Sequence, residues 1–127
     1  MKLGKIVAIV AMVAMSTTLG AQAKIDELIR FEKTAYSFGK IAKEKPVTVE
    51  FVFSNPGTKP LIIADATAEC GCTKPEFPKK PVMPGQKGTI KVTYDAKEPG
   101  VFTKKVTVTL VNVSETKILT IQGEVIK

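Results

Sequence analysis

The sequence predicts an all-β fold, an antiparallel β-sandwich of about seven strands, and three observations support this prediction. Apolar and polar residues alternate with a period of two in several short segments after Ile29, as in strands that bury one face. No segment in that region has helical periodicity, so nothing there could serve as the crossover helices of a parallel sheet. Turn signals rich in Pro and Gly separate the alternating segments.

The first 23 residues have the layout of a secretory signal peptide. A short basic start precedes the apolar run 6–15, and Ala21-Gln22-Ala23 forms a small-x-small cleavage site. The run is shorter than the roughly 20 residues that span a bilayer, which disfavours the alternative of an uncleaved anchor. We expect cleavage after Ala23, a periplasmic or secreted protein, and no stable membrane span. The first cysteine is Cys70, so a lipid-acceptor cysteine is not predicted.

Removal of this segment leaves one domain, residues 24–127. Taking Lys2 and Lys5 from the 19 Lys and Arg leaves 17 against 12 Asp and Glu, so the net charge falls from +7 to +5. A chain of this size buries about 65% of the surface of its unfolded form, which is enough for a single core.

Four segments show the alternation clearly. In the first of them, Val47, Val49, Phe51 and Phe53 share one face, which we expect to lie in the core. The four clear strands are 47–54, 90–95, 106–110 and 119–125, and three less regular candidates are 29–32, 35–38 and 60–65.

The turns between these strands contain proline followed by glycine. Asn55-Pro56-Gly57, Pro84-Gly85 and Pro99-Gly100 each combine a fixed φ with a residue that tolerates positive φ, as a type II turn requires. The stretch 66–83 contains both cysteines and three prolines, and we expect it to be irregular.

The absence of histidine and tryptophan limits both the function and the fold. Without histidine there is no Ser-His-Asp triad, no Cys-His pair and no His-ligated zinc site, so we predict neither a catalytic residue nor a cofactor. An antibody-type domain pairs distant cysteines beside a tryptophan, whereas the two cysteines here are two positions apart. The predicted sandwich is therefore Ig-like in architecture only.

Cys70-Gly71-Cys72 is the one element that could carry chemistry. Residues i and i+2 of a strand lie about 6.5 Å apart at Cα, near the upper limit for a disulfide, and Gly71 permits a tighter bend. A disulfide is therefore feasible but strained, and strain makes such a pair easier to reduce. Three interpretations stay open: a structural pair or local bridge, a thiol redox couple, or a Cu(I) site with Met83 as a third ligand.

The basic excess is spread over the sequence and interleaved with acids, as on a solvated surface. Attraction to anionic envelope material is the alternative. Nucleic-acid binding is not predicted, because Arg30 is the single arginine and no aromatic residues accompany the lysines.

An ordered set of motifs lies between Tyr36 and Val125. The motifs are Phe53-Ser54-Asn55-Pro56-Gly57, Pro60-Leu61-Ile62-Ile63, Cys70-Gly71-Cys72-Thr73, Pro84-Gly85, Gly88-Thr89-Ile90, Gly100-Val101-Phe102 and Gly123. This set resembles the family of secreted bacterial domains of unknown function 1573. The resemblance implies an exported or lipid-anchored Ig-like β-sandwich without an established activity, and a feature at Cys70 and Cys72 that is structural or reactive. The chain departs from the family pattern at 110–113 and in having no lipid-acceptor cysteine.

These observations predict a non-enzymatic module of the bacterial cell envelope. We expect it to bind a protein or another envelope component through its loops or an exposed sheet edge. The alternative is a periplasmic thiol-redox or Cu(I)-binding protein that uses Cys70 and Cys72. The oligomeric state is not predicted.

Overall fold

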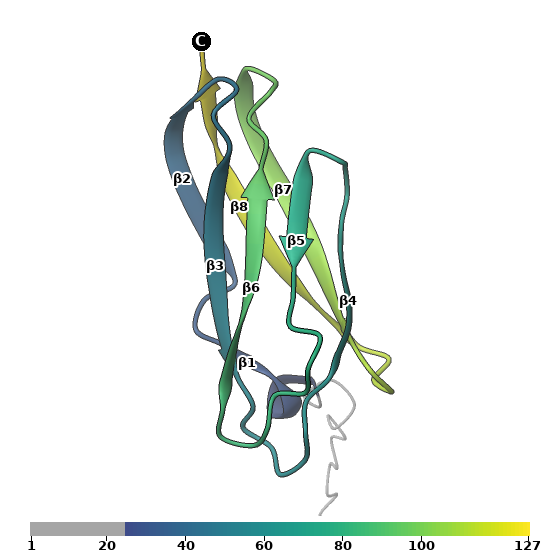
Figure 1. The fold of residues 1–127 in the computed structure, drawn as a ribbon. Coiled ribbons are helices and arrows are strands. Elements are labelled where there is room, and N and C mark those ends of the chain that lie inside the picture. Colours follow the sequence, from purple (N-terminus) through teal and green to yellow (C-terminus); the bar gives the residue numbers. More distant parts are fainter. Residues whose placement is uncertain (1–24) are drawn as a thin grey trace, which may run out of the picture.

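The computed structural model describes residues 25–127 and arranges them as a two-layer β-sandwich (Figure 1). The predicted signal peptide, residues 1–23, and its cleavage site at Ala23 lie outside the described residues. A helical turn at residues 25–28 precedes the first strand. The strands are β1 (Arg30–Phe31), β2 (Ala35–Ala42), β3 (Val47–Ser54), β4 (Ile63–Ala68), β5 (Thr73–Glu76), β6 (Lys87–Tyr94), β7 (Gly100–Leu110) and β8 (Thr116–Ile126).

The strands form two sheets of four, in the orders β1-β3-β6-β5 and β2-β8-β7-β4. The predicted sandwich is confirmed, but one strand pair differs from the expectation. β2 and β8 run parallel, with Ala35 opposite Thr120 and Ile41 opposite Val125. No crossover helix is needed, because the strands between β2 and β8 in the chain make the connection themselves.

The stretch 66–83, expected to be irregular, contains the end of β4 and all of β5. The sequence did not predict β5, because the segment Thr-Lys-Pro-Glu has no apolar alternation and contains Pro75. The structure explains the proline: β5 is an edge strand that pairs with β6 on one side, and edge strands tolerate proline.

The core lies between the two sheets and is built from the apolar faces that the alternation predicted. Phe51 and Phe53 on β3 are completely buried. Tyr94 of β6 stacks on Phe102 of β7, with ring centroids 4.0 Å apart and an interplanar angle of 12°, so this aromatic pair joins one sheet to the other.

Two glycines provide space for phenylalanine rings of neighbouring strands. Phe53 is paired with Gly88 and Phe102 is paired with Gly123. A Cβ atom on Gly88 would lie 2.5 Å from Phe53 Cζ, and one on Gly123 would lie 2.9 Å from Phe102 Cζ. Each ring therefore packs where its partner has no side chain.

Gly123→Ala is expected to lower the free energy of unfolding by about 1–3 kcal/mol, because an added methyl overpacks this site. The new Cβ would also lie 2.9 Å from the backbone oxygen of Gly39, which cannot move freely. Urea denaturation measures the effect. Gly71→Ala is the matched control, since a Cβ there meets nothing within 4 Å. Equal losses in the two variants would contradict the steric explanation.

The proline-containing turns differ from one another. At Pro84-Gly85 the predicted type II turn is confirmed, because Gly85 has a φ of 81° and the amide of Gln86 donates to the carbonyl of Met83 at 2.9 Å. At Asn55-Pro56-Gly57 the prediction is wrong, since Gly57 does not have positive φ. Its amide instead donates to Asn55 Oδ1 at 2.9 Å, which makes an Asx turn.

Candidate functional site

The cysteines lie at the corner where the chain passes from one sheet to the other. β4 is an edge strand of one sheet and β5 of the other, and residues 69–72 connect them at the end of the sandwich that also holds the C-terminus (Figure 1). Cys70 and Cys72 form a disulfide with a Cα–Cα distance of 5.3 Å. This is shorter than the spacing of a regular strand, because the chain turns at this corner.

We call residues 69–72 the crossover corner, and hydrogen bonds hold it in place independently of the disulfide. The amide of Thr73 donates to the carbonyl of Cys70 at 3.3 Å, and the amide of Asp95 donates to the carbonyl of Cys72 at 3.0 Å. On the other side, the amide of Lys105 donates to Glu69 Oε1 at 3.0 Å. The corner is thus attached to the strands and loops of both sheets.

The two cysteines differ in their surroundings. Both are half-buried and Gly71 between them is exposed. Cys72 packs against the hydrophobic core, and its Sγ lies 3.6 Å from the Oγ1 of Thr73. Thr73 itself is only 3% exposed. The sequence interpretation gave Thr73 no role, although its place in Cys-Gly-Cys-Thr was the available signal.

Tyr94 is the residue paired with Thr73 across the β5–β6 ladder. Loss of hydration raises the pKa of its phenol above the ordinary value of 10.0, and the carboxylates of Asp95 and Glu98 raise it further. Tyr94 is therefore a neutral phenol at neutral pH.

Met83, the third ligand of the Cu(I) interpretation, lies at the other end of β6. It precedes the turn that leads into Lys87, whereas the cysteines adjoin Thr73, the partner of Tyr94. The length of β6 separates these positions by roughly 20 Å, given the rise of a strand. Within residues 25–127, no three or more Cys, Asp and Glu side chains gather as a metal site would require. The structure does not bring Met83 to the cysteine pair.

A groove of about 620 Å³ lies at the opposite end of the sandwich, which we call the loop-end groove. Two of its apolar side chains are well exposed, Ile62 at 40% and Val111 at 41%, and the amide of Val111 donates to the carbonyl of Ile62 at 3.0 Å. The groove is lined by Glu27, Leu28, Asn55, Gly57, Thr58, Lys59, Pro60, Leu61, Ile62, Leu110, Val111, Asn112 and Val113.

Asn55 fixes one wall of the loop-end groove. Its side chain is 2% exposed, and its Nδ2 donates to the carbonyl of Lys59 at 2.7 Å and to the carbonyl of Val82 at 2.8 Å. Together with the bond from Gly57 to Oδ1, these contacts satisfy the buried amide. They connect the β3–β4 loop to the segment that precedes β6.

The helical turn at 25–28 forms the other wall and is attached to the start of β8. Lys117 Nζ donates to Asp26 Oδ1 at 2.5 Å, and the amide of Ile25 donates to Glu115 Oε1 at 3.1 Å. The groove is therefore bounded by segments that hydrogen bonds hold in place.

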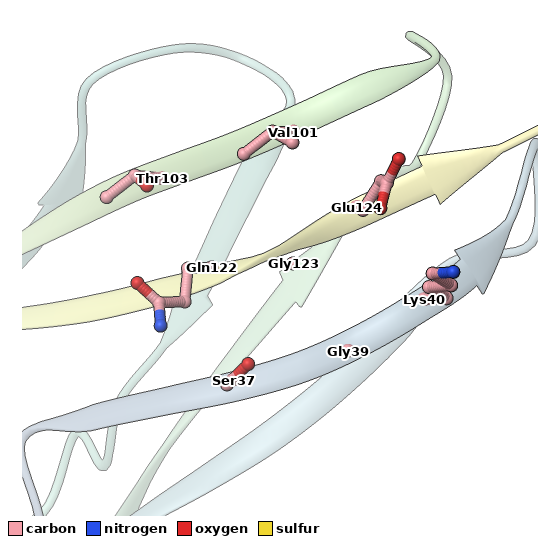
Figure 2. A pocket seen from close by; sticks show the side chains of 8 residues that line it. All are labelled: Ser37, Gly39, Lys40, Val101, Thr103, Gln122, Gly123 and Glu124. Atoms are coloured by element: carbon pink, nitrogen blue, oxygen red, sulfur yellow. The ribbon is translucent and has the colours of Figure 1, made fainter.

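Figure 2 shows the residues that line a second, smaller hollow on the sheet that contains β2, β8 and β7. Its volume is about 370 Å³, and its side chains come from all three strands. Val101 is 81% exposed, and Lys40 lies opposite Glu124 in the β2–β8 ladder. The hollow lies beside the bulge of β2 at Gly39, whose φ is 73°. Its side chains do not converge on a common point.

The sheet edges are short or interrupted, which disfavours pairing with an added strand. β1 has two residues and β5 contains a proline, while β2 and β4 have irregular registers, between Ser37 and Lys40 and between Ile63 and Asp65. Of the two binding surfaces predicted from the sequence, loops or an exposed sheet edge, the loops are the better candidate.

None of the helical structure in residues 25–127 has the length and apolar character of a membrane-spanning helix.

The two sheets and their strand orders define the class of the protein as an Ig-like β-sandwich domain. More specifically, the chain belongs to the family described as protein of unknown function (DUF1573), whose model matches residues 29–125. The match begins at Ile29, before the predicted start at Tyr36. No curated protein matches the sequence.

Solved structures share the fold at low sequence identity. The PapD-like domain 7 of human CEP192 has a TM-score of 0.68 and 8% identity, covering 97% of this chain and 99% of that domain. A protein of unknown function from Porphyromonas gingivalis W83 has a TM-score of 0.66 and 10% identity, covering 76% of this chain and 46% of that one. The VesB protease of Vibrio cholerae has a TM-score of 0.61 and 14% identity, covering 80% of this chain and 33% of that one. The chain spans less than half of the latter two proteins, and these similarities establish the fold alone.

Proposed function

We propose that this protein is an exported, non-enzymatic binding domain of the bacterial cell envelope, periplasmic or secreted, that contacts another protein through its loop-end groove. The observation that carries the proposal is the exposure of Ile62 and Val111 within a groove of about 620 Å³. Adjacent exposed apolar side chains in a concave surface are typical of binding sites.

The charges around the groove favour a protein segment with apolar side chains over an anionic polymer. Glu27 and Lys59, both exposed, contribute one charge of each sign to the lining. A surface for a polyanion would instead concentrate lysines. The other polar side chains of the lining, those of Asn55, Thr58 and Asn112, are uncharged.

Ile62→Asp and Val111→Asp test the groove. We expect each variant to weaken capture of a specific envelope protein by at least about tenfold, because a carboxylate is placed in the apolar contact. Val101→Asp is the matched control, since Val101 is 81% exposed and lies outside the groove. The measurement is the affinity of the captured protein for each purified variant.

Loss of binding in Val101→Asp as well, or unchanged binding in both groove variants, would contradict the assignment. Circular dichroism of each variant checks that the fold is retained. N-terminal sequencing of the exported protein tests the compartment, with Lys24 expected as the first residue.

A further inference from the structure

The groove makes no use of the cysteine pair, which lies at the other end of the sandwich. We propose that Cys70–Cys72 is a redox-active disulfide that exchanges with thiol or dithiol partners, in which Cys70 is attacked and Thr73 stabilises the departing Cys72 thiolate. This inference does not rest on the proposed binding function.

The disulfide is poorly suited to a stabilising role. It closes a loop of three residues, and the stabilisation that a cross-link gives by restricting the unfolded chain grows with loop length. The crossover corner is already held by the bonds from Thr73 to Cys70, from Asp95 to Cys72 and from Lys105 to Glu69. Reduction should therefore leave the fold intact.

The position of the pair permits attack by an external thiol. Gly71 is exposed, and the corner joins two edge strands. Cys72 packs against the core, so its sulfur is partly covered by neighbouring side chains. Cys70 lies two residues after the end of β4 and is not among the partly buried side chains that pack against the core. The geometry thus favours Cys70 Sγ as the sulfur that is attacked.

Thr73 supplies a hydrogen-bond donor to the other sulfur. Its hydroxyl lies 3.6 Å from Cys72 Sγ, within hydrogen-bonding range of sulfur, and pairing with Tyr94 fixes its position. A hydroxyl that donates to a thiolate stabilises the charged form and lowers the thiol pKa. A thiol of lower pKa is also a faster leaving group in disulfide exchange.

Two acidic residues take part in the hydrogen bonds of the crossover corner. Glu69 accepts from the amide of Lys105 through its side chain, and Asp95 donates through its backbone amide to the carbonyl of Cys72. The Thr73 hydroxyl is the specific contact to the sulfur.

Exchange proceeds in two steps, which together transfer two electrons. A partner thiolate attacks Cys70 Sγ, which forms a mixed disulfide and releases the Cys72 thiolate as the S–S bond breaks. A second partner thiolate then attacks the partner sulfur of this mixed disulfide, which releases the Cys70 thiolate. Both cysteine thiolates take up protons, and the partner becomes a disulfide. The reverse sequence oxidises the domain and reduces the partner.

The first experiment uses the exported, oxidised protein with dithiothreitol and oxidised glutathione as probes. Alkylation followed by intact-mass analysis counts free thiols, and circular dichroism monitors the fold. We expect dithiothreitol to expose two thiols in the folded protein and oxidised glutathione to restore the disulfide. Reduction that occurs only when the protein unfolds would overturn the proposal.

Further measurements then test the role of each residue. Brief treatment of the oxidised protein with reduced glutathione, followed by an acid quench and peptide mass analysis, should find glutathione on Cys70 rather than Cys72, and equal amounts on both would overturn the assignment of Cys70. Thr73→Val should slow reduction by about fivefold, as expected for a leaving thiol of higher pKa. Thr73→Ser, which keeps the hydroxyl, should restore the rate.

The thiolate absorbance of the reduced protein as a function of pH gives a readout that a structural role for Thr73 would not change. The lower of the two thiol pKa values should rise in Thr73→Val and return in Thr73→Ser. Unchanged rates and titration would overturn the role of Thr73. Should Thr73→Val fail to fold, the position of the glutathione adduct still decides the assignment of Cys70. Ile62→Asp should exchange at the wild-type rate, so the binding and redox proposals can fail separately.

Discussion

Asn55→Asp is expected to lower the free energy of unfolding by about 3–5 kcal/mol at neutral pH, as for other uncompensated buried charges. Asn55 is 2% exposed, and its Nδ2 donates to two carbonyl oxygens, those of Lys59 and Val82. The substitution replaces this donor with a carboxylate oxygen that faces the same two acceptors. Denaturant unfolding at neutral pH measures the loss.

The loss in Asn55→Asp should become smaller as the pH falls. Burial beside acceptor oxygens raises the pKa of the new carboxyl above its unfolded value, so the folded state binds the proton more tightly. The penalty is thus greatest above the folded pKa and declines below it, where the protonated carboxyl can donate one hydrogen bond. Asn112→Asp is the control, because Asn112 is exposed. A pH-independent penalty, or an equal one in the control, would contradict the explanation.

Phe53→Ala is expected to cost about 3–5 kcal/mol, the usual range for removing a buried aromatic ring. Phe53 is completely buried, its ring centroid lies 5.6 Å from that of Phe31, and it packs over Gly88. Thermal and urea unfolding measure the effect. Phe77→Ala, at a half-buried position in the loop after β5, is the control and should cost less.

Gly88 provides a second test of the same contact. Gly88→Ala should destabilise the wild-type protein, since the new Cβ would lie 2.5 Å from Phe53 Cζ. In the Phe53→Ala background the same change should be nearly neutral or stabilising, because the methyl then fills part of the cavity. Additive effects of the two substitutions would show that the ring and the glycine are not coupled.

The strands that the sequence predicted best are those with one fully buried face. Alternation of Val and Phe with polar residues located β3 and the later long strands, because burial of one face imposes a period of two. β5 was not predicted, because an edge strand needs little apolar alternation. The parallel pairing of β2 with β8 was not predicted either, because alternation gives no information about strand direction.

The candidate site was predicted less completely than the fold. The Cys-Gly-Cys motif located the crossover corner, but its residues do not reveal that it joins two sheets. The role of Thr73 comes from the position of its buried hydroxyl beside the sulfur of Cys72. The role of Asn55 comes from hydrogen bonds to carbonyl groups up to 27 positions away in the chain. Contacts of this kind depend on tertiary structure and have no local periodicity.

The pairing of β2 with β8 also determines when the domain can complete its fold. Ala35 pairs with Thr120 and Ala42 with Ile126. A strand near the start of the domain therefore cannot pair until the last residues of the chain are present. As the chain emerges from the ribosome, β2 has no partner in its sheet until β8 is made. Such long-range pairing slows folding. During that interval the unpaired backbone groups of β2 could pair with another chain.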